Sequence, residues 1–99
     1  MCKVMRICGD SLVPRLHDGD FVLCSKIPIL LKRLKPGDLV VFNQPGYGVL
    51  IKELETITPD GQSLVVRGLH PESVDSRAFG PVPRKDIIGK VIWRVRGNV

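Results

Sequence analysis

The chain has no apolar run long enough for a membrane helix. Its longest apolar stretch, Ile27 to Leu31, contains a proline and stops at Lys32, whereas a membrane span needs about 20 apolar residues. The first six residues, Met1 to Arg6, also lack the apolar segment of a secretion signal. We therefore expect a soluble, cytoplasmic protein with no transmembrane segment.

Cysteine and histidine are scarce as well. The three cysteines, Cys2, Cys8 and Cys24, form no Cys-x-x-Cys pair, and His17 and His70 do not lie beside a cysteine pair. This pattern disfavours both a zinc site and a disulfide framework. We expect no metal and no other cofactor.

Aromatic residues make up only 5% of the chain, although 15 Lys and Arg against 10 Asp and Glu leave a net charge of +5. The basic residues are spread along the sequence without interleaved aromatics, which disfavours a base-stacking nucleic-acid surface. We expect a solvated basic surface, suited to acidic or membrane-proximal substrates, and no nucleic-acid partner.

No segment has helical periodicity, and Pro and Gly divide the chain into short pieces. With 43% hydrophobic residues and 99 residues in all, residues 1–99 should form a single domain with one modest core. The region from Ile27 to Leu34 fits either a helical turn or an apolar loop, and Gly68 to Pro83 reads as a loop. The expected strands are residues 2–8, 20–26, 39–42, 49–58, 63–67 and 87–95. The sequence thus predicts a mainly β protein, an antiparallel sheet or small barrel.

Lys52 is the first candidate for catalytic chemistry. In an extended strand it shares one face with Leu50 and Leu54, while Glu53 points to the other face. Flanking leucines would desolvate the amine, and desolvation lowers the pKa of a lysine. A lysine in this setting can serve as a general base, although a lysine on a strand is more often simply solvated.

Ser11 is the second candidate. It follows Gly9 and Asp10 and precedes Pro14, a composition that places its hydroxyl in a constrained turn where backbone N–H groups can stabilise an oxyanion. An ordinary turn serine has the same local composition. A histidine base would require His17 or His70, and neither has a recognisable catalytic context.

Four segments in order resemble the serine-lysine protease superfamily of type I signal peptidases and LexA-type self-cleaving repressors. The segments are Gly9-Asp10-Ser11-Leu12-Val13-Pro14-Arg15-Leu16, Lys35-Pro36-Gly37-Asp38-Leu39-Val40-Val41-Phe42, Leu50-Ile51-Lys52-Glu53-Leu54 and Ser73-Val74-Asp75-Ser76-Arg77-Ala78-Phe79-Gly80-Pro81. The resemblance implies a mainly β catalytic core of coiled antiparallel sheets, or a partly open barrel. Within the superfamily the chain looks most like the short, anchorless branch that includes nickel-type superoxide dismutase maturation proteases.

The resemblance also implies residue roles. Ser11 would be the nucleophile and Lys52 the general base, with Ser73 hydrogen-bonded to the lysine amine. Asp75 and Arg77 would pair with each other to hold their loop. The implied reaction is the cleavage of an extended segment of a protein precursor through an acyl-enzyme.

The substrate would add as a strand beside residues 5–9. The residues that we expect to contact it are Met5, Ile7, Cys8, Gly9 and Leu12. Leu12 stands where the family usually has methionine, and Gly68-Leu69-His70 stands where signal peptidases commonly have Gly-Asp-Asn. The alternative function is a LexA-like regulatory or dimerisation module whose self-cleavage is slow or absent, and the oligomeric state stays open.

Overall fold

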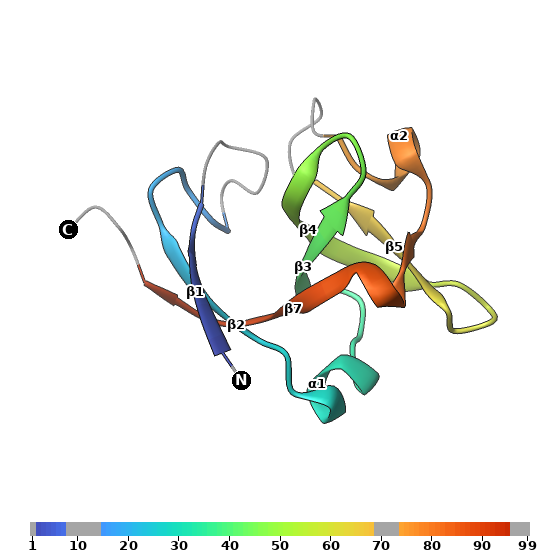
Figure 1. The fold of residues 1–99 in the computed structure, drawn as a ribbon, viewed down its shortest axis with the longest axis horizontal. Coiled ribbons are helices and arrows are strands. Elements are labelled where there is room, and N and C mark those ends of the chain that lie inside the picture. The colour runs from blue at the N-terminus through green and yellow to red at the C-terminus, as the bar shows by residue number, and fades with distance from the viewer. Residues whose placement is uncertain (1, 8–14, 69–73, 96–99) are drawn as a thin grey trace.

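A single antiparallel sheet of seven strands forms the body of the protein in the computed structural model (Figure 1), which describes residues 2–7, 15–68 and 74–95. The spatial order of the strands is β1-β2-β7-β3-β4-β5-β6, and every neighbouring pair is antiparallel. The two end strands, β1 and β6, do not pair with each other, so the sheet is not closed. The strands are β1 (Cys2–Arg6), β2 (Phe21–Ser25), β3 (Leu39–Gln44), β4 (Gly48–Ile57), β5 (Ser63–Arg67), β6 (Val82–Pro83) and β7 (Ile87–Val95). The predicted mainly β fold is confirmed.

Helical structure is limited to short segments in the described part of the chain. The helix α1 (Pro28–Lys32) occupies the region that the sequence left open between a helical turn and a loop. The expected loop from Gly68 to Pro83 also contains the one-turn helix α2 (Ser76–Phe79) and the strand β6, and a 3₁₀ turn (Arg84–Asp86) precedes β7. No helix in the described ranges is long and apolar enough to cross a membrane.

Strand β7 connects the two parts of the sheet. Its C-terminal part pairs with β2, from Phe21↔Val95 to Ser25↔Lys90, and its N-terminal part pairs with β3, from Val40↔Lys90 to Phe42↔Ile87. In Figure 1, β1 and β2 therefore lie on one side of the molecule and β3, β4 and β5 on the other, with β7 running between them.

Two buried clusters stabilise this bent sheet. The larger lies among β3–β7 and is built from Leu34, Val40, Phe42, Leu54, Leu64, Val66, Val82 and Ile87; the smaller lies between β1–β2 and β3 and is built from Ile7, Leu16, Val22 and Leu39. Strand β3 contributes to both clusters because alternate residues face opposite sides. This explains why its continuous apolar run, Leu39 to Phe42, is buried at every position.

Candidate active site

Lys52 is the buried cation of the described residues. It lies on β4 in register with Val40 of β3, and its side chain is only 5% exposed. Leu54, two residues along the same face, is 1% exposed, and Leu50 is half-buried. The alternation expected from the sequence thus places the amine among apolar side chains.

Burial lowers the pKa of Lys52 below its ordinary value of 10.5, because a low-dielectric surrounding penalises the ammonium and not the neutral amine. The negative charge of Asp75 acts in the opposite direction and raises the pKa, but by less than burial lowers it. No ion pair involving Lys52 occurs among the described residues. The balance of these effects favours a neutral amine at lower pH than an exposed lysine would allow.

Asp75 is prevented from pairing with Lys52 by a closer partner. Its carboxylate is 1% exposed and accepts two hydrogen bonds from the Arg77 guanidinium, from Nε to Oδ1 at 3.0 Å and from Nη2 to Oδ2 at 2.9 Å. Burial acts to raise the pKa of Asp75, but hydrogen bonds from the side chain and backbone N–H of Arg77 and the backbone N–H of Gly68 bring it below 3.8. The Asp75–Arg77 pair implied by the family resemblance is therefore present.

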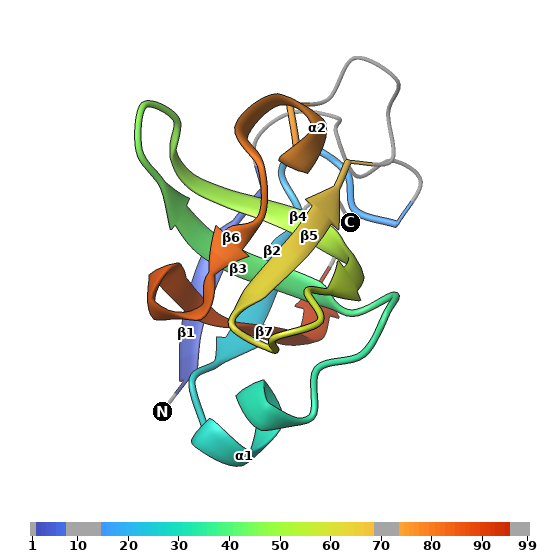
Figure 2. The ribbon, with the colours of Figure 1, turned by 90° about the vertical axis from the view of Figure 1, so that its right-hand side faces the viewer.

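The same carboxylate fixes the loop to the sheet. The backbone N–H of Gly68, which follows β5, donates to Asp75 Oδ2 at 3.0 Å, and Asp75 also caps α2 by accepting from the backbone N–H of Arg77. The hydroxyl of Ser76 accepts from the backbone N–H of Val66 on β5 at 2.9 Å. In Figure 2, α2 accordingly lies beside one end of β5.

Lys52 lies where the pairing of β4 changes. On one side β4 pairs with β3 along its whole first half, from Gln44↔Gly48 to Leu39↔Glu53. On the other side the ladder with β5 ends at Glu53↔Arg67, so Gly48 to Lys52 have no ladder partner there among the described strands. An unpaired strand edge presents N–H and C=O groups that can bind an extended peptide.

On the opposite face of β4, Glu53 binds two arginines from distant parts of the chain. Its Oε2 lies 3.0 Å from Arg15 Nη1, and its Oε1 lies 3.2 Å from Arg67 Nη2. Arg15 Nη1 also donates to the carbonyl of Gly37 at 2.7 Å, and Arg94 donates to the carbonyl of Arg15. Sequence reasoning placed Glu53 on this face correctly but missed both arginine partners, since nothing local connects residues 38 and 14 positions apart.

Two of the predicted substrate contacts are described, and both face the smaller cluster. Ile7 is 6% exposed and belongs to that cluster, and Met5 packs against it, with Cys24 Sγ 3.8 Å from Met5 Sδ. The backbone groups of Ile7 are bonded to the turn before β2, through Ile7 N to Asp20 O and Gly19 N to Ile7 O. Any contact of these two residues with a peptide would therefore involve backbone more than side chain.

The other predicted site residues lie outside the described part of the chain: Ser11, Ser73, Cys8, Gly9 and Leu12. Their roles stay predictions. Arg15 and Gly68, the described residues that border these two segments most closely along with Val74, are held by Glu53 and Asp75 as above.

Comparison with known families agrees with this architecture. Residues 1–92 match the family model described as Peptidase S24-like. No curated protein matches the chain.

Proposed function

This chain belongs to the Peptidase S24-like family, and from that premise we propose that it is a serine endopeptidase with a Ser11–Lys52 dyad. The observation that carries the proposal is the state of Lys52, a buried lysine whose pKa is lowered by desolvation at an open strand edge. Strongly perturbed lysines in such positions are characteristic of general bases.

In the proposed reaction the neutral Lys52 amine takes the hydroxyl proton of Ser11 as the serine oxygen attacks a peptide carbonyl. The resulting ammonium gives this proton to the leaving amine, and an ester between Ser11 and the acyl part remains. Water, deprotonated by the same lysine, then hydrolyses the ester. Ser73 orients the lysine amine in this scheme, a role that comes from the family resemblance.

The Asp75–Arg77 pair supports the proposal through electrostatics. A free carboxylate beside Lys52 would favour the ammonium and remove the base. Because Arg77 already donates two hydrogen bonds to Asp75, the carboxylate can hold the loop in place while its field at Lys52 is partly cancelled. Burial remains the larger effect on the pKa of Lys52.

The substrate in this proposal is an extended segment of another protein. It would lie along the open edge of β4, Gly48 to Lys52, with β1 at the nearer end of the sheet as the second candidate edge. The similarity to maturation proteases, which rests on the box from Asp75 to Pro81, suggests that this segment is an N-terminal extension of a precursor.

Cleavage of a broad peptide library tests the proposal. We expect wild-type protein and the control Lys85→Ala, an exposed lysine, to cleave, and Ser11→Ala and Lys52→Ala to lose at least about 10³-fold in rate. Cleavage that persists in both variants would contradict the dyad. Absence of cleavage by wild type would favour the LexA-like regulatory module instead.

A further inference from the structure

The outer face of the β1–β2–β7 layer carries a set of aligned apolar side chains. Cross-strand partners lie on the same face of a sheet, and two such rows occur here. One is Val4–Leu23–Trp93 and the other is Arg6–Phe21–Val95. The residue between them on β2, Val22, points the other way and is buried in the smaller cluster.

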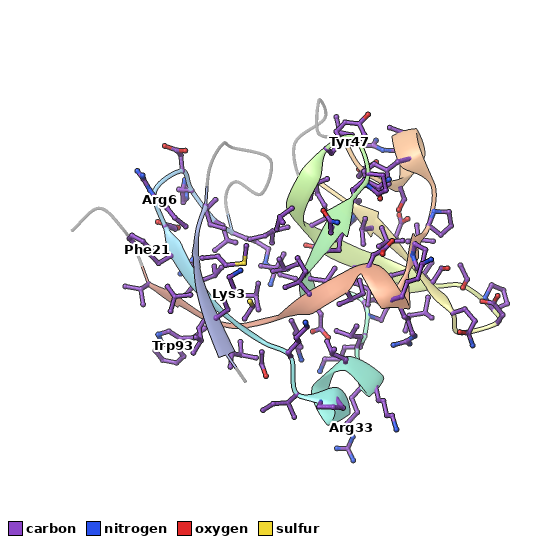
Figure 3. The ribbon with its side chains drawn as sticks, viewed as in Figure 1. Lys3, Arg6, Phe21, Arg33, Tyr47 and Trp93 are labelled. Atoms are coloured by element: carbon purple, nitrogen blue, oxygen red, sulfur yellow. The ribbon has the colours of Figure 1, made fainter. Side chains whose placement is uncertain are left out.

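Most of this outer face is open to solvent. Val4 is 65% exposed, Trp93 66% and Val95 53%, and Phe21 is 40% exposed. Figure 3 shows Phe21 and Trp93 directed away from the body of the molecule on the same side. We call the set Val4, Phe21, Leu23, Trp93 and Val95 the outer apolar face. A contiguous apolar surface of this kind marks an interaction site more often than scattered exposed side chains do.

The charge around the outer apolar face has one sign. Strands β1, β2 and β7 contain Lys3, Arg6, Lys90 and Arg94 and no acidic residue. Arg6 lies within the second row, beside Phe21. Acidic residues enter only in the turn before β2, at Asp18 and Asp20, and Asp20 is buried.

We propose that the outer apolar face binds the surface of an anionic lipid bilayer. An exposed Trp and Phe on a flat sheet can enter the interfacial region, where amphipathic aromatic rings are favoured. Arginine and lysine side chains at the rim can reach anionic headgroups, each contributing about 1 kcal/mol near such a surface. The net charge of +5 acts in the same direction over longer range.

Charge complementarity favours this partner over a second copy of the chain. Two outer apolar faces packed against each other would bring two sets of basic strands together, and these strands supply no carboxylate to pair with them. An anionic bilayer supplies the missing negative charge. The inference does not depend on the proposed peptidase activity.

The single tryptophan makes the proposal directly measurable, because Trp93 lies on the outer apolar face itself. We expect vesicles of phosphatidylcholine with about 30% phosphatidylglycerol to shift the Trp93 emission to shorter wavelength, and added salt to reverse the shift. Vesicle sedimentation of Phe21→Ser and Trp93→Ser should show about tenfold weaker binding, and Arg6→Gln about fivefold weaker binding. Tyr47→Ser is the matched control, since Tyr47 is 52% exposed but lies on the β3–β4 turn.

Several outcomes would overturn the proposal. No emission shift with anionic vesicles would do so, as would equal binding to vesicles of phosphatidylcholine alone. A shift that depends on protein concentration without lipid would assign the face to a second copy. Equal loss of binding in Tyr47→Ser would show that the outer apolar face is not the site. Circular dichroism of each variant verifies the fold.

Discussion

Glu53 and Arg15 form an ion pair across 38 residues of sequence, with Arg15 Nη1 3.0 Å from Glu53 Oε2. The second carboxylate oxygen receives Arg67 at 3.2 Å. One side chain next to Lys52 therefore joins the segment after Ser11 to the end of β5. The three elements that would form the proposed active site meet on this carboxylate.

We expect Glu53→Gln to lower the free energy of unfolding by about 0.5–1 kcal/mol. The two arginines are substantially exposed, and exposed ion pairs contribute modestly because water screens them. Urea denaturation measures the change. Glu55→Gln, an exposed acid on the same strand, should change stability by less than about 0.5 kcal/mol; equal effects of the two substitutions would contradict a specific role of the ion pairs.

Lys52→Met should stabilise the protein at neutral pH, by about 1 kcal/mol or more, since a tenfold change in a proton-binding constant corresponds to about 1.4 kcal/mol. The pKa of Lys52 is lowered by burial, so between that lowered pKa and 10.5 the unfolded chain binds more protons than the folded one. Wild-type stability contributed by this group must then rise with pH over that interval. Urea denaturation as a function of pH should show this slope in wild type and in Lys85→Met but not in Lys52→Met. An unchanged slope in Lys52→Met would contradict the lowered pKa.

Arg77→Gln should move the alkaline rise of peptidase activity to higher pH. Removing the guanidinium leaves the Asp75 carboxylate free to stabilise the Lys52 ammonium, which raises the pKa of Lys52. Asp75→Asn should move the rise to lower pH, because the group that raises the pKa of Lys52 is then neutral. A profile of kcat/KM against pH separates these two directions. Shifts of the same sign in both variants would show that Asp75 does not act on Lys52 electrostatically.

Gly89→Ala should cost about 1–3 kcal/mol of stability. A Cβ at this position of β7 would lie 2.9 Å from the carbonyl oxygen of Ser25, a distance that requires the backbone of β2 or β7 to shift. Thermal unfolding provides the measurement. Thr56→Ala, exposed on β4, serves as the control, and equal melting temperatures of Gly89→Ala and wild type would refute the close approach.

Local patterns were sufficient for most of the fold. The alternation of Leu50, Lys52 and Leu54 predicted which face of β4 is buried, since side chains alternate along any strand. The continuous apolar run from Leu39 to Phe42 predicted a strand buried on both faces. The short segments α2 and β6 were missed because each is stabilised by contacts with β5, such as the hydrogen bond of Ser76 to Val66, and not by its own composition.

The site divides in the same way. The desolvation of Lys52 was predictable from its two leucine neighbours, and Ser11 and Ser73 remain predictions from the family motifs. The field of Asp75 at Lys52 and the ion pairs of Glu53 were not predictable from any local pattern. These interactions depend on which strands pair and in what register.

The absence of a long apolar run seemed at first only to exclude a membrane helix, and the sequence by itself determined no more than that, together with the strands, the apolar setting of Lys52 and the family. Tertiary structure decided where the remaining hydrophobic residues lie. Val4, Phe21, Trp93 and Val95 are scattered over the chain, and only the pairing of β1, β2 and β7 brings them to one face. The physical reason is that a strand specifies which side chains share its face, whereas the register between strands specifies which of those faces become one surface.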